Sequence, residues 1–176
     1  MSGSPIVLDA SAAIALIRRE PAAAALDVIL RRSAREAVRL LAPEAFWLEI
    51  ANVLVRRYGL TPNEVVEAIR ETDDLGIETI PMDRPLLLVT IDIQARDGLS
   101  AYDAVYLALA ETEDARLLTL DRRLSLAAGP RAIPIPGLGQ ERLSELPAPY
   151  GTPVDWARFG PYLARLRADA HEVAGA

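Results

Sequence analysis

Short apolar segments alternate with longer helical segments along most of this 176-residue chain. Apolar runs of four to seven residues, rich in Val, Ile and Leu, are typical of strands that are buried on both faces. Their alternation with helices predicts an α/β fold, a three-layer α/β/α sandwich with a short, mainly parallel central sheet. The expected strands are PIVL (5–8), VRLLA (38–42), IETIP (77–81), ARLLTLD (115–121) and RAIPI (131–135).

Capping residues and prolines locate the helices between these strands. Thr61 to Glu64 matches the capping-box pattern and predicts a helix start. Asp83 and Ser100 are expected to cap the two helices that follow. Pro21 and Pro43 are expected to lie in the first turns of two earlier helices. The expected helical segments are 10–19, 21–34, 43–59, 61–74, 85–98 and 101–113.

The composition limits the classes of protein to consider. With 51% hydrophobic and 25% charged residues, the chain can form one domain with a sizeable core. The absence of cysteine excludes a disulfide framework and a thiolate zinc site. No apolar run approaches the roughly 18 residues needed to span a bilayer, and the N-terminus lacks the basic region of a signal peptide. We therefore expect a cytoplasmic protein that does not associate with membranes.

The composition changes after Ile135. Residues 136–176 begin with a stretch rich in Pro and Gly and end with an expected helix. The extension is also rich in aromatic residues, and such a segment is expected to dock on its own core or on a second subunit. We therefore divide the chain into a domain over 1–135 and a C-terminal extension over 136–176. The extension holds four of the nine aromatic residues, namely Tyr150, Trp156, Phe159 and Tyr162.

Four acidic residues lie at the ends of apolar segments or within apolar helices. Asp9 and Asp121 follow expected strands, at the carboxyl edge where ligands collect in open α/β sheets. Asp103 lies in the first turn of an almost wholly apolar helix, and Glu49 shares a helix face with Asn52. Each also has a structural explanation. Asp9 and Asp121 could be helix N-caps, Asp103 could complete a capping box, and Glu49 could be exposed.

Taken as a set, the four acids indicate a divalent metal site. Burying a carboxylate is costly unless something pairs with it. All 19 basic residues are Arg, and the one histidine, His171, lies far from these segments. Carboxylate and carboxamide oxygens suit Mg²⁺ or Mn²⁺. Without cysteine or lysine, the chain has neither a thiol nucleophile nor a P-loop lysine, which leaves water activated by metal.

The charge distribution bears on whether the chain binds nucleic acid. The net charge of −6 argues against such binding, because proteins that bind phosphates usually carry a basic surplus. However, arginines gather at 18–19, 31–39, 56–57 and 122–123. Arginines at the rim of a metal-loaded acidic pocket could hold a phosphodiester. The alternative is that they are solvated residues on helix surfaces.

The motifs around the four acids resemble those of a known family. LDAS, LEIANVL, LSAYDAVYLALA and LLTLD stand in the order and spacing of PIN-domain ribonucleases, and the chain most resembles the VapC-type toxins of bacterial toxin–antitoxin pairs. The resemblance covers about residues 5–135. It implies an acidic quartet that holds one or two Mg²⁺ or Mn²⁺ ions, supported by neighbouring polar residues. The quartet would be Asp9, Glu49, Asp103 and Asp121, and the supporting residues Ser11, Asn52 and Thr119.

The resemblance implies a metal-dependent endoribonuclease that hydrolyses RNA phosphodiester bonds, as the toxin of such a pair. It further implies a cognate antitoxin as partner and a homodimer. We expect Asp9, Glu49 and Asp103 to hold the first ion, and Asp121 to hold a second ion or position water. The extension after Ile135, which compact toxins of this kind lack, leaves partner binding and oligomeric form open.

Other classes fit less well. A two-component receiver domain also gathers acids at strand ends, but it uses a lysine, which this chain lacks. A haloacid-dehalogenase-like phosphatase needs a D-x-D motif after its first strand, and here Asp9 is followed by Ala10 and Ser11. The remaining alternative is a catalytically weak or inactive PIN-like module that binds RNA or protein.

Overall fold

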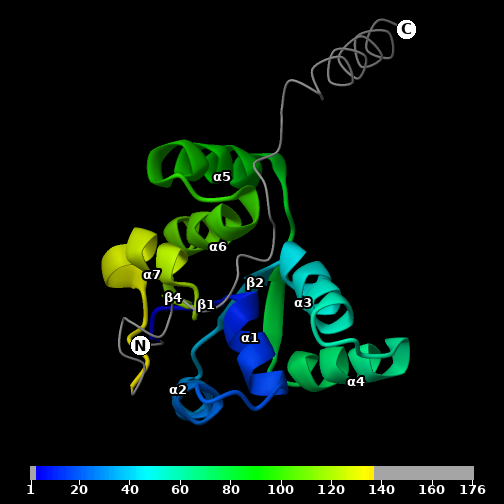
Figure 1. Ribbon diagram of the computed structural model, residues 1–176. Helices are drawn as coiled ribbons and strands as arrows, with labels where there is room; N and C mark the ends of the chain where they lie inside the picture. The colour runs from blue at the N-terminus through cyan, green and yellow to red at the C-terminus, as the bar shows by residue number, and fades with distance from the viewer. Residues whose placement is uncertain (1–2, 137–176) are drawn as a thin grey trace, which may run out of the picture.

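The computed structural model describes residues 3–136, in which a central sheet is covered by helices on both sides (Figure 1). The expected α/β/α architecture is confirmed. The extension beyond residue 136, including its expected helix and His171, lies outside the described residues. The strands are β1 (Ile6–Leu8), β2 (Leu40–Pro43), β3 (Ile77–Ile80) and β4 (Arg116–Leu118). The helices are α1 (Ala10–Ile17), α2 (Ala23–Arg35), α3 (Ala45–Arg56), α4 (Pro62–Asp73), α5 (Arg84–Asp97), α6 (Ala101–Thr112) and α7 (Arg122–Ala128), with a 3-10 helix at Gly129–Arg131.

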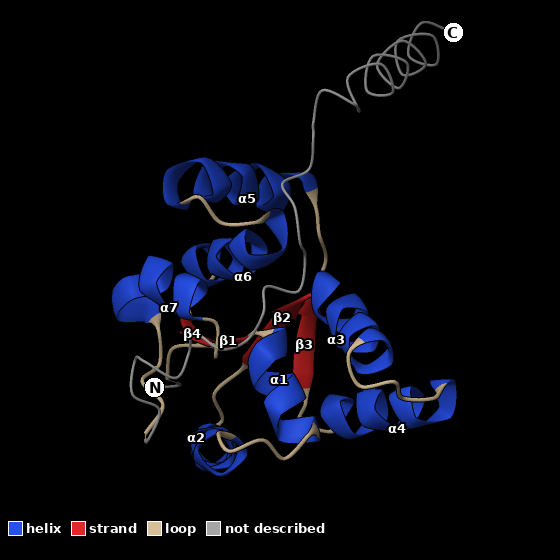
Figure 2. Ribbon diagram, in the orientation of Figure 1, coloured by secondary structure: helices blue, strands red, loops and turns tan. Residues whose placement is uncertain are grey.

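The sheet is wholly parallel and has the order β3-β2-β1-β4 (Figure 2). The chain moves outward from β1 through β2 to β3, and then returns to the other side of β1 with β4. The order therefore reverses between β1 and β4. In open α/β sheets, the crevice beyond the carboxyl ends of the strands at such a reversal is the usual ligand site. Asp9 follows β1 directly, and Asp121 lies three residues beyond β4.

The helix α6 forms the centre of one face of the sheet. It packs on β1, β2 and β4 and is covered on its outer side by α5. Seven consecutive residues of α6, Ala104 to Ala110, are buried, because the helix has protein on both sides. The opposite side carries α1, α2 and α4 (Figure 1). Within residues 3–136, no helix is both long enough and apolar enough to cross a membrane.

The predicted helix starts that rest on polar caps are confirmed. Thr61 and Glu64 form a complete capping box at the start of α4. The Asp83 side chain accepts the Leu86 backbone N–H at 2.9 Å, and Ser100 accepts the Asp103 backbone N–H at 3.1 Å. Each cap satisfies one of the N–H groups that a helix start leaves unpaired.

Three expectations about element boundaries are corrected. Pro43 ends β2 instead of starting α3, and Pro21 lies in a turn before α2. Proline fixes φ in a range that suits a strand end or a turn as well as a first helical turn. The RAIPI segment forms only an isolated bridge from Ala132 to Leu117. The sequence analysis considered Asp121 as a possible helix N-cap but did not include α7, the helix that it starts, among the expected helices.

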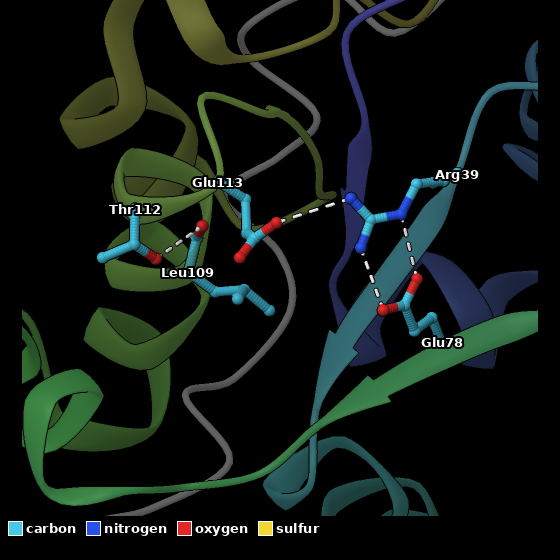
Figure 3. Close-up of polar contacts among 5 residues, drawn as sticks. All are labelled: Arg39, Glu78, Leu109, Thr112 and Glu113. Atoms are coloured by element: carbon cyan, nitrogen blue, oxygen red, sulfur yellow. Dashed lines mark hydrogen bonds and ion pairs between the residues drawn. The ribbon is translucent and has the colours of Figure 1, made fainter. Parts of the chain in front are cut away.

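Arg39, which precedes β2, links three elements at their solvent edge (Figure 3). Its guanidinium donates to both carboxylate oxygens of Glu78 on β3, at 3.0 and 2.9 Å. It also lies 3.6 Å from a carboxylate oxygen of Glu113, just beyond α6. Since these side chains are largely exposed, the ion pairs are expected to add at most about 1 kcal/mol each.

Candidate active site

A pocket opens at the point where the strand order reverses. It spans about 600 Å³, including space open to solvent, and all four predicted acids line it together with Ser11. They come from the ends of two strands and from two helices. Asp9 follows β1, Asp121 precedes α7, Glu49 lies on α3 and Asp103 lies in the first turn of α6. The fold thus brings together residues that are up to 112 positions apart in the chain.

Hydrogen bonds fix the Asp9 carboxylate in the pocket lining. Its Oδ2 accepts from the hydroxyls of Ser11 and Thr119, the latter at 2.7 Å. Ser11 Oγ in turn accepts the Leu120 backbone N–H at 2.9 Å, and Thr119 Oγ1 accepts the Asp121 backbone N–H at 2.9 Å. Because each hydroxyl both donates and accepts, the network joins the end of β1 to the end of β4 and holds the Asp9 carboxylate in one orientation.

Glu49 is fixed by a tyrosine from the opposite side. Tyr106 of α6 is almost fully buried and donates its hydroxyl to Glu49 Oε2 at 2.8 Å. Glu49 is itself only 8% exposed, so the alternative of an exposed position on α3 is wrong. This contact joins α3 to α6 across the pocket.

Asp103 and Asp121 both take part in helix caps. Ser100 Oγ donates to Asp103 Oδ2 at 2.7 Å, while accepting the Asp103 backbone N–H. Asp121 Oδ1 accepts the Leu124 backbone N–H at 2.8 Å. The N-cap role considered for Asp121 is therefore confirmed, while Asp103 stands at the capping-box position of a helix capped by Ser100. Both residues also line the pocket. Asp9 occupies the N-cap position of α1 but makes no side-chain capping bond.

The hydrogen bonds found within residues 3–136 engage only one oxygen of each of the four carboxylates. The engaged atoms are Asp9 Oδ2, Glu49 Oε2, Asp103 Oδ2 and Asp121 Oδ1. Asp9, Glu49 and Asp121 are thus each held by one oxygen, which leaves the second oxygen available to a ligand, whereas Asp103 also interacts with the Ser100 backbone. An arrangement of this kind is expected of carboxylates that bind a cation, whose ligands are themselves held by hydrogen bonds.

The pocket disfavours negative charge on its own acids. Burial raises the pKa of Asp9 to about 6, although Ser11 and Thr119 oppose the shift. Burial, reinforced by the charge of Asp9, raises the pKa of Glu49 to about 8. The pKa of Asp103 is also raised, again mainly by burial. Metal-free protein therefore retains protons in this pocket near neutral pH, and a cation would favour their release.

The donor set fits Mg²⁺ or Mn²⁺, since it consists of carboxylate and hydroxyl oxygens. Within the described part of the chain, however, no three acidic side chains already stand as a group that could hold an ion. The four carboxylates instead surround shared space. An ion would therefore have to draw their free oxygens inward.

The three predicted supporting residues differ in their position relative to the pocket. Ser11 lines the pocket, and Thr119 lies beneath it and contacts Asp9. Asn52 is half-buried one turn beyond Glu49 and does not line the pocket. The sequence analysis did not identify Tyr106. A tyrosine within an otherwise apolar buried helix needs an acceptor for its hydroxyl, and that requirement was the available indication.

Comparisons with known proteins agree with this geometry. A family model described as the PIN domain matches residues 6–130. A crystal structure of PAE2754 from Pyrobaculum aerophilum is 26% identical, with a TM-score of 0.53, over 73% of this chain and 82% of that one. No curated protein matches the sequence.

Two further solved structures share the fold at lower identity. The toxin VapC20 of Mycobacterium tuberculosis, described as cleaving the sarcin-ricin loop, is 18% identical with a TM-score of 0.59, over 73% of this chain and 99% of that one. A chain of a toxin–antitoxin complex from Klebsiella pneumoniae is 17% identical with a TM-score of 0.52, over 84% of this chain and 99% of that one.

Proposed function

Because this chain belongs to the PIN-domain family, we propose that it is a metal-dependent endoribonuclease that hydrolyses RNA phosphodiester bonds. The main support is the pocket itself. Four carboxylates from four elements line it, and Asp9, Glu49 and Asp121 each have one oxygen held by the protein and one left available. Within residues 3–136 no fully buried side-chain oxygen lacks a hydrogen-bond partner, so the unengaged oxygens of these acids are open to the pocket and not sealed in the core.

The quartet of Asp9, Glu49, Asp103 and Asp121 would hold one or two Mg²⁺ or Mn²⁺ ions. When bound, such an ion acidifies water and neutralises charge that develops on the phosphate. The chain's own residues supply orientation. Ser11 and Thr119 hold Asp9, Tyr106 holds Glu49, and Ser100 holds Asp103, and all three acids line one pocket.

The same residues account for the handling of protons. In the metal-free pocket Glu49, with a pKa of about 8, retains its proton at neutral pH, whereas Asp9, with a pKa of about 6, loses its proton just below neutral pH. Both must be ionised to hold a cation, so activity is expected to rise with pH as these carboxyls lose their protons. We assign Asp9, Glu49 and Asp103 to the first ion, and Asp121 to a second ion or to positioning water.

Cleavage of a mixed RNA pool tests the proposal. The full chain is incubated with Mn²⁺ or Mg²⁺, with EDTA, and as the Asp103→Asn variant. Cleavage that needs the metal and disappears in Asp103→Asn supports the nuclease. The matched control is Asp92→Asn, which removes an exposed acid from α5 and should cleave normally. A folded protein that binds metal and RNA but never cleaves would indicate the alternative, a PIN-like binding module.

We further propose that the nuclease is the toxin of a toxin–antitoxin pair, working in the cytoplasm with a cognate antitoxin and as a homodimer. The likeness in fold to VapC20 and to a toxin–antitoxin complex supports this. Leu87, Leu88 and Ile91 of α5 are 45 to 57% exposed, and exposed apolar patches often contact other proteins. The proposal predicts a short gene for a DNA-binding protein directly upstream, whose product should co-purify with this chain and suppress its cleavage.

A further inference from the structure

The pocket extends beyond the four acids, and its chemical character changes along its length. The acids lie at one end, where the strands finish. Ile14 of α1 and Val53 of α3 line the middle, and Glu20, Arg57 and Tyr58 line the other end. Glu49 and Arg57 are eight residues apart along α3 and its C-cap, which corresponds to roughly 12 Å at the rise of an α-helix. The pocket is therefore an elongated groove between α1 and α3, which pack together.

The far end of this groove is built around the Tyr58 ring. The Arg18 guanidinium carbon lies 4.6 Å from the ring centroid, and that of Arg57 lies 5.4 Å from it. The Tyr58 hydroxyl donates to Glu20 at 2.7 Å. This bond fixes the ring and also engages Glu20, the acid that lines this end of the pocket. We call Arg57 and Tyr58, which line the pocket, together with Arg18, which lies over the Tyr58 ring outside the lining, the arginine–tyrosine end of the groove.

Within residues 3–136, the two arginines differ from the other exposed arginines by lying over an aromatic ring. Arg31, Arg39 and Arg96, for example, each contact a carboxylate within 3 Å. Among the ion pairs found in residues 3–136, none includes Arg18 or Arg57. A guanidinium that lies over an aromatic ring keeps its N–H groups free at the edge. The arginine–tyrosine end thus presents two oriented cations with unused donors.

Resting on the proposed function, we propose that this groove binds a single-stranded polynucleotide lengthwise. The scissile phosphate lies at the carboxylates, a sugar or base lies over Ile14 and Val53, and a flanking phosphate is bound by Arg57 and Arg18. The order of surfaces matches the substrate, because a nucleotide strand also alternates anionic and apolar parts. Arginine binds phosphate with paired donors, and the acidic end alone would repel a strand.

A purely structural role makes different predictions. Arg18 and Arg57 occupy the C-cap positions of α1 and α3, where a cation stabilises a helix. Arg18 also contributes to lowering the pKa of Glu64, which is caused mainly by hydrogen bonds from Thr61. Loss of such roles would lower the melting temperature and leave the affinity for a nucleotide strand unchanged.

The test measures binding of a fluorescein-labelled single-stranded RNA of mixed sequence to the full chain. All proteins carry Asp103→Asn to suppress cleavage, and Mg²⁺ is present. Arg57→Gln is compared with Arg56→Gln, which removes the same charge from a neighbouring exposed position outside the pocket lining. We expect Arg57→Gln to weaken binding roughly tenfold and to lower the salt slope by about 0.7, as for one lost phosphate contact on a single strand.

Two further variants refine the result. Arg18→Gln should act in the same direction as Arg57→Gln. Arg57→Lys keeps the charge but loses the paired donors, so it should retain the salt slope and recover only part of the affinity. Equal losses in Arg57→Gln and Arg56→Gln, or a lower melting temperature with unchanged affinity, would overturn the inference. So would failure of the parent to bind the strand.

Cleavage by the wild-type chain is measured separately, with Mn²⁺. If wild-type protein does not cleave while Arg57→Gln still weakens binding selectively, the nuclease proposal fails and the binding groove remains. If wild-type protein cleaves and Arg57→Gln leaves both KM and affinity unchanged, the groove is wrong and the nuclease remains. In a cleaving enzyme, the expected effect of Arg57→Gln is a raised KM with little change in kcat, since the contact lies away from the reacting phosphate.

Discussion

At the scale of single residues, the acids of the site are held by hydrogen bonds from neutral hydroxyl groups. Asp9, Glu49 and Asp103 each accept a hydroxyl hydrogen bond, whereas no arginine forms an ion pair with any of them in residues 3–136. A hydroxyl orients a carboxylate without cancelling its charge. The acids therefore remain costly to ionise, and their pKa values are raised by burial.

This cost predicts how stability depends on pH. The pKa of Asp9 is raised from 3.8 to about 6 and that of Glu49 from 4.5 to about 8. Between the ordinary and raised values, the folded protein binds more protons than the unfolded chain. The free energy of unfolding of metal-free protein should therefore fall as pH rises from about 4 to about 8, by on the order of a few kcal/mol. Urea titrations in EDTA at several pH values measure it.

The variants for this test are Glu49→Gln and the control Asp92→Asn. Glu49→Gln should flatten the decline, because glutamine carries no charge that must be desolvated. The free energy of unfolding of Asp92→Asn should fall with pH as it does in the parent, because residue 92 is exposed on α5. If the free energy of unfolding of the parent instead rises steadily towards pH 8, burial does not dominate the pKa values of Asp9 and Glu49.

Tyr106→Phe is the sharpest change at a residue that the sequence analysis missed. It keeps the buried ring but removes the hydrogen bond that lowers the pKa of Glu49. The pKa of Glu49 should rise further, so the pH at which RNA cleavage reaches half its maximum should also rise. A loss of roughly 1 kcal/mol in stability should accompany it. Tyr102→Phe, on the same helix but half exposed, is the control and should leave the pH profile in place.

At the scale of elements, helix caps have a second use near the pocket. Ser100 caps α6 and simultaneously orients Asp103, whereas Thr61 caps α4 far from the quartet in the chain. Ser100→Ala and Thr61→Ala should each cost about 1 kcal/mol of stability. Only Ser100→Ala should also lower kcat for RNA cleavage. Melting curves and kinetics on both variants check this, and equal kinetic effects would mean that the Ser100 cap is structural only.

The elements differ in how far the sequence could predict them. Starts marked by a polar cap, such as those at Thr61, Asp83 and Ser100, were predicted correctly because the capping bond is local. Starts inferred from proline alone were not, since Pro43 serves equally well at the end of β2. RAIPI reads as a strand by composition, yet it forms only one bridge, because pairing depends on the position of β4.

At the scale of the whole molecule, the sequence could predict which acids share the site but not how the site is built. Asp9 and Asp121 could be placed at one sheet edge because parallel strands end there together. The pairing of Tyr106 with Glu49, 57 positions apart, depends on how α3 and α6 pack. The arginine–tyrosine end likewise arises from the C-termini of α1 and α3, which nothing local in the sequence brings together.

Metal binding depends on the acidic residues, on the elements that position them and on the whole fold, and thermal unfolding can measure it. A ligand that binds only the folded state at 100 times its Kd stabilises that state by about 2.7 kcal/mol, or roughly 5–10 °C in Tm for a chain of this size. Mn²⁺ should therefore raise the Tm of the parent. The increase should grow from about pH 6 to about pH 8, as Asp9 and Glu49 release their protons.

Asp9→Asn should reverse the order of stabilities. Without metal, the variant should have a higher Tm than the parent at about pH 8. It removes a carboxylate whose pKa is raised by burial and whose ionisation therefore destabilises the fold. With saturating Mn²⁺, it should melt below the parent, because it has lost a ligand that the ion needs. A substitution that only stabilises the fold, or only destabilises it, would shift the Tm in the same direction with and without Mn²⁺. The reversal thus distinguishes a carboxylate retained for a cation from one retained for the fold, and a parent whose Tm ignores Mn²⁺ would contradict the metal site itself.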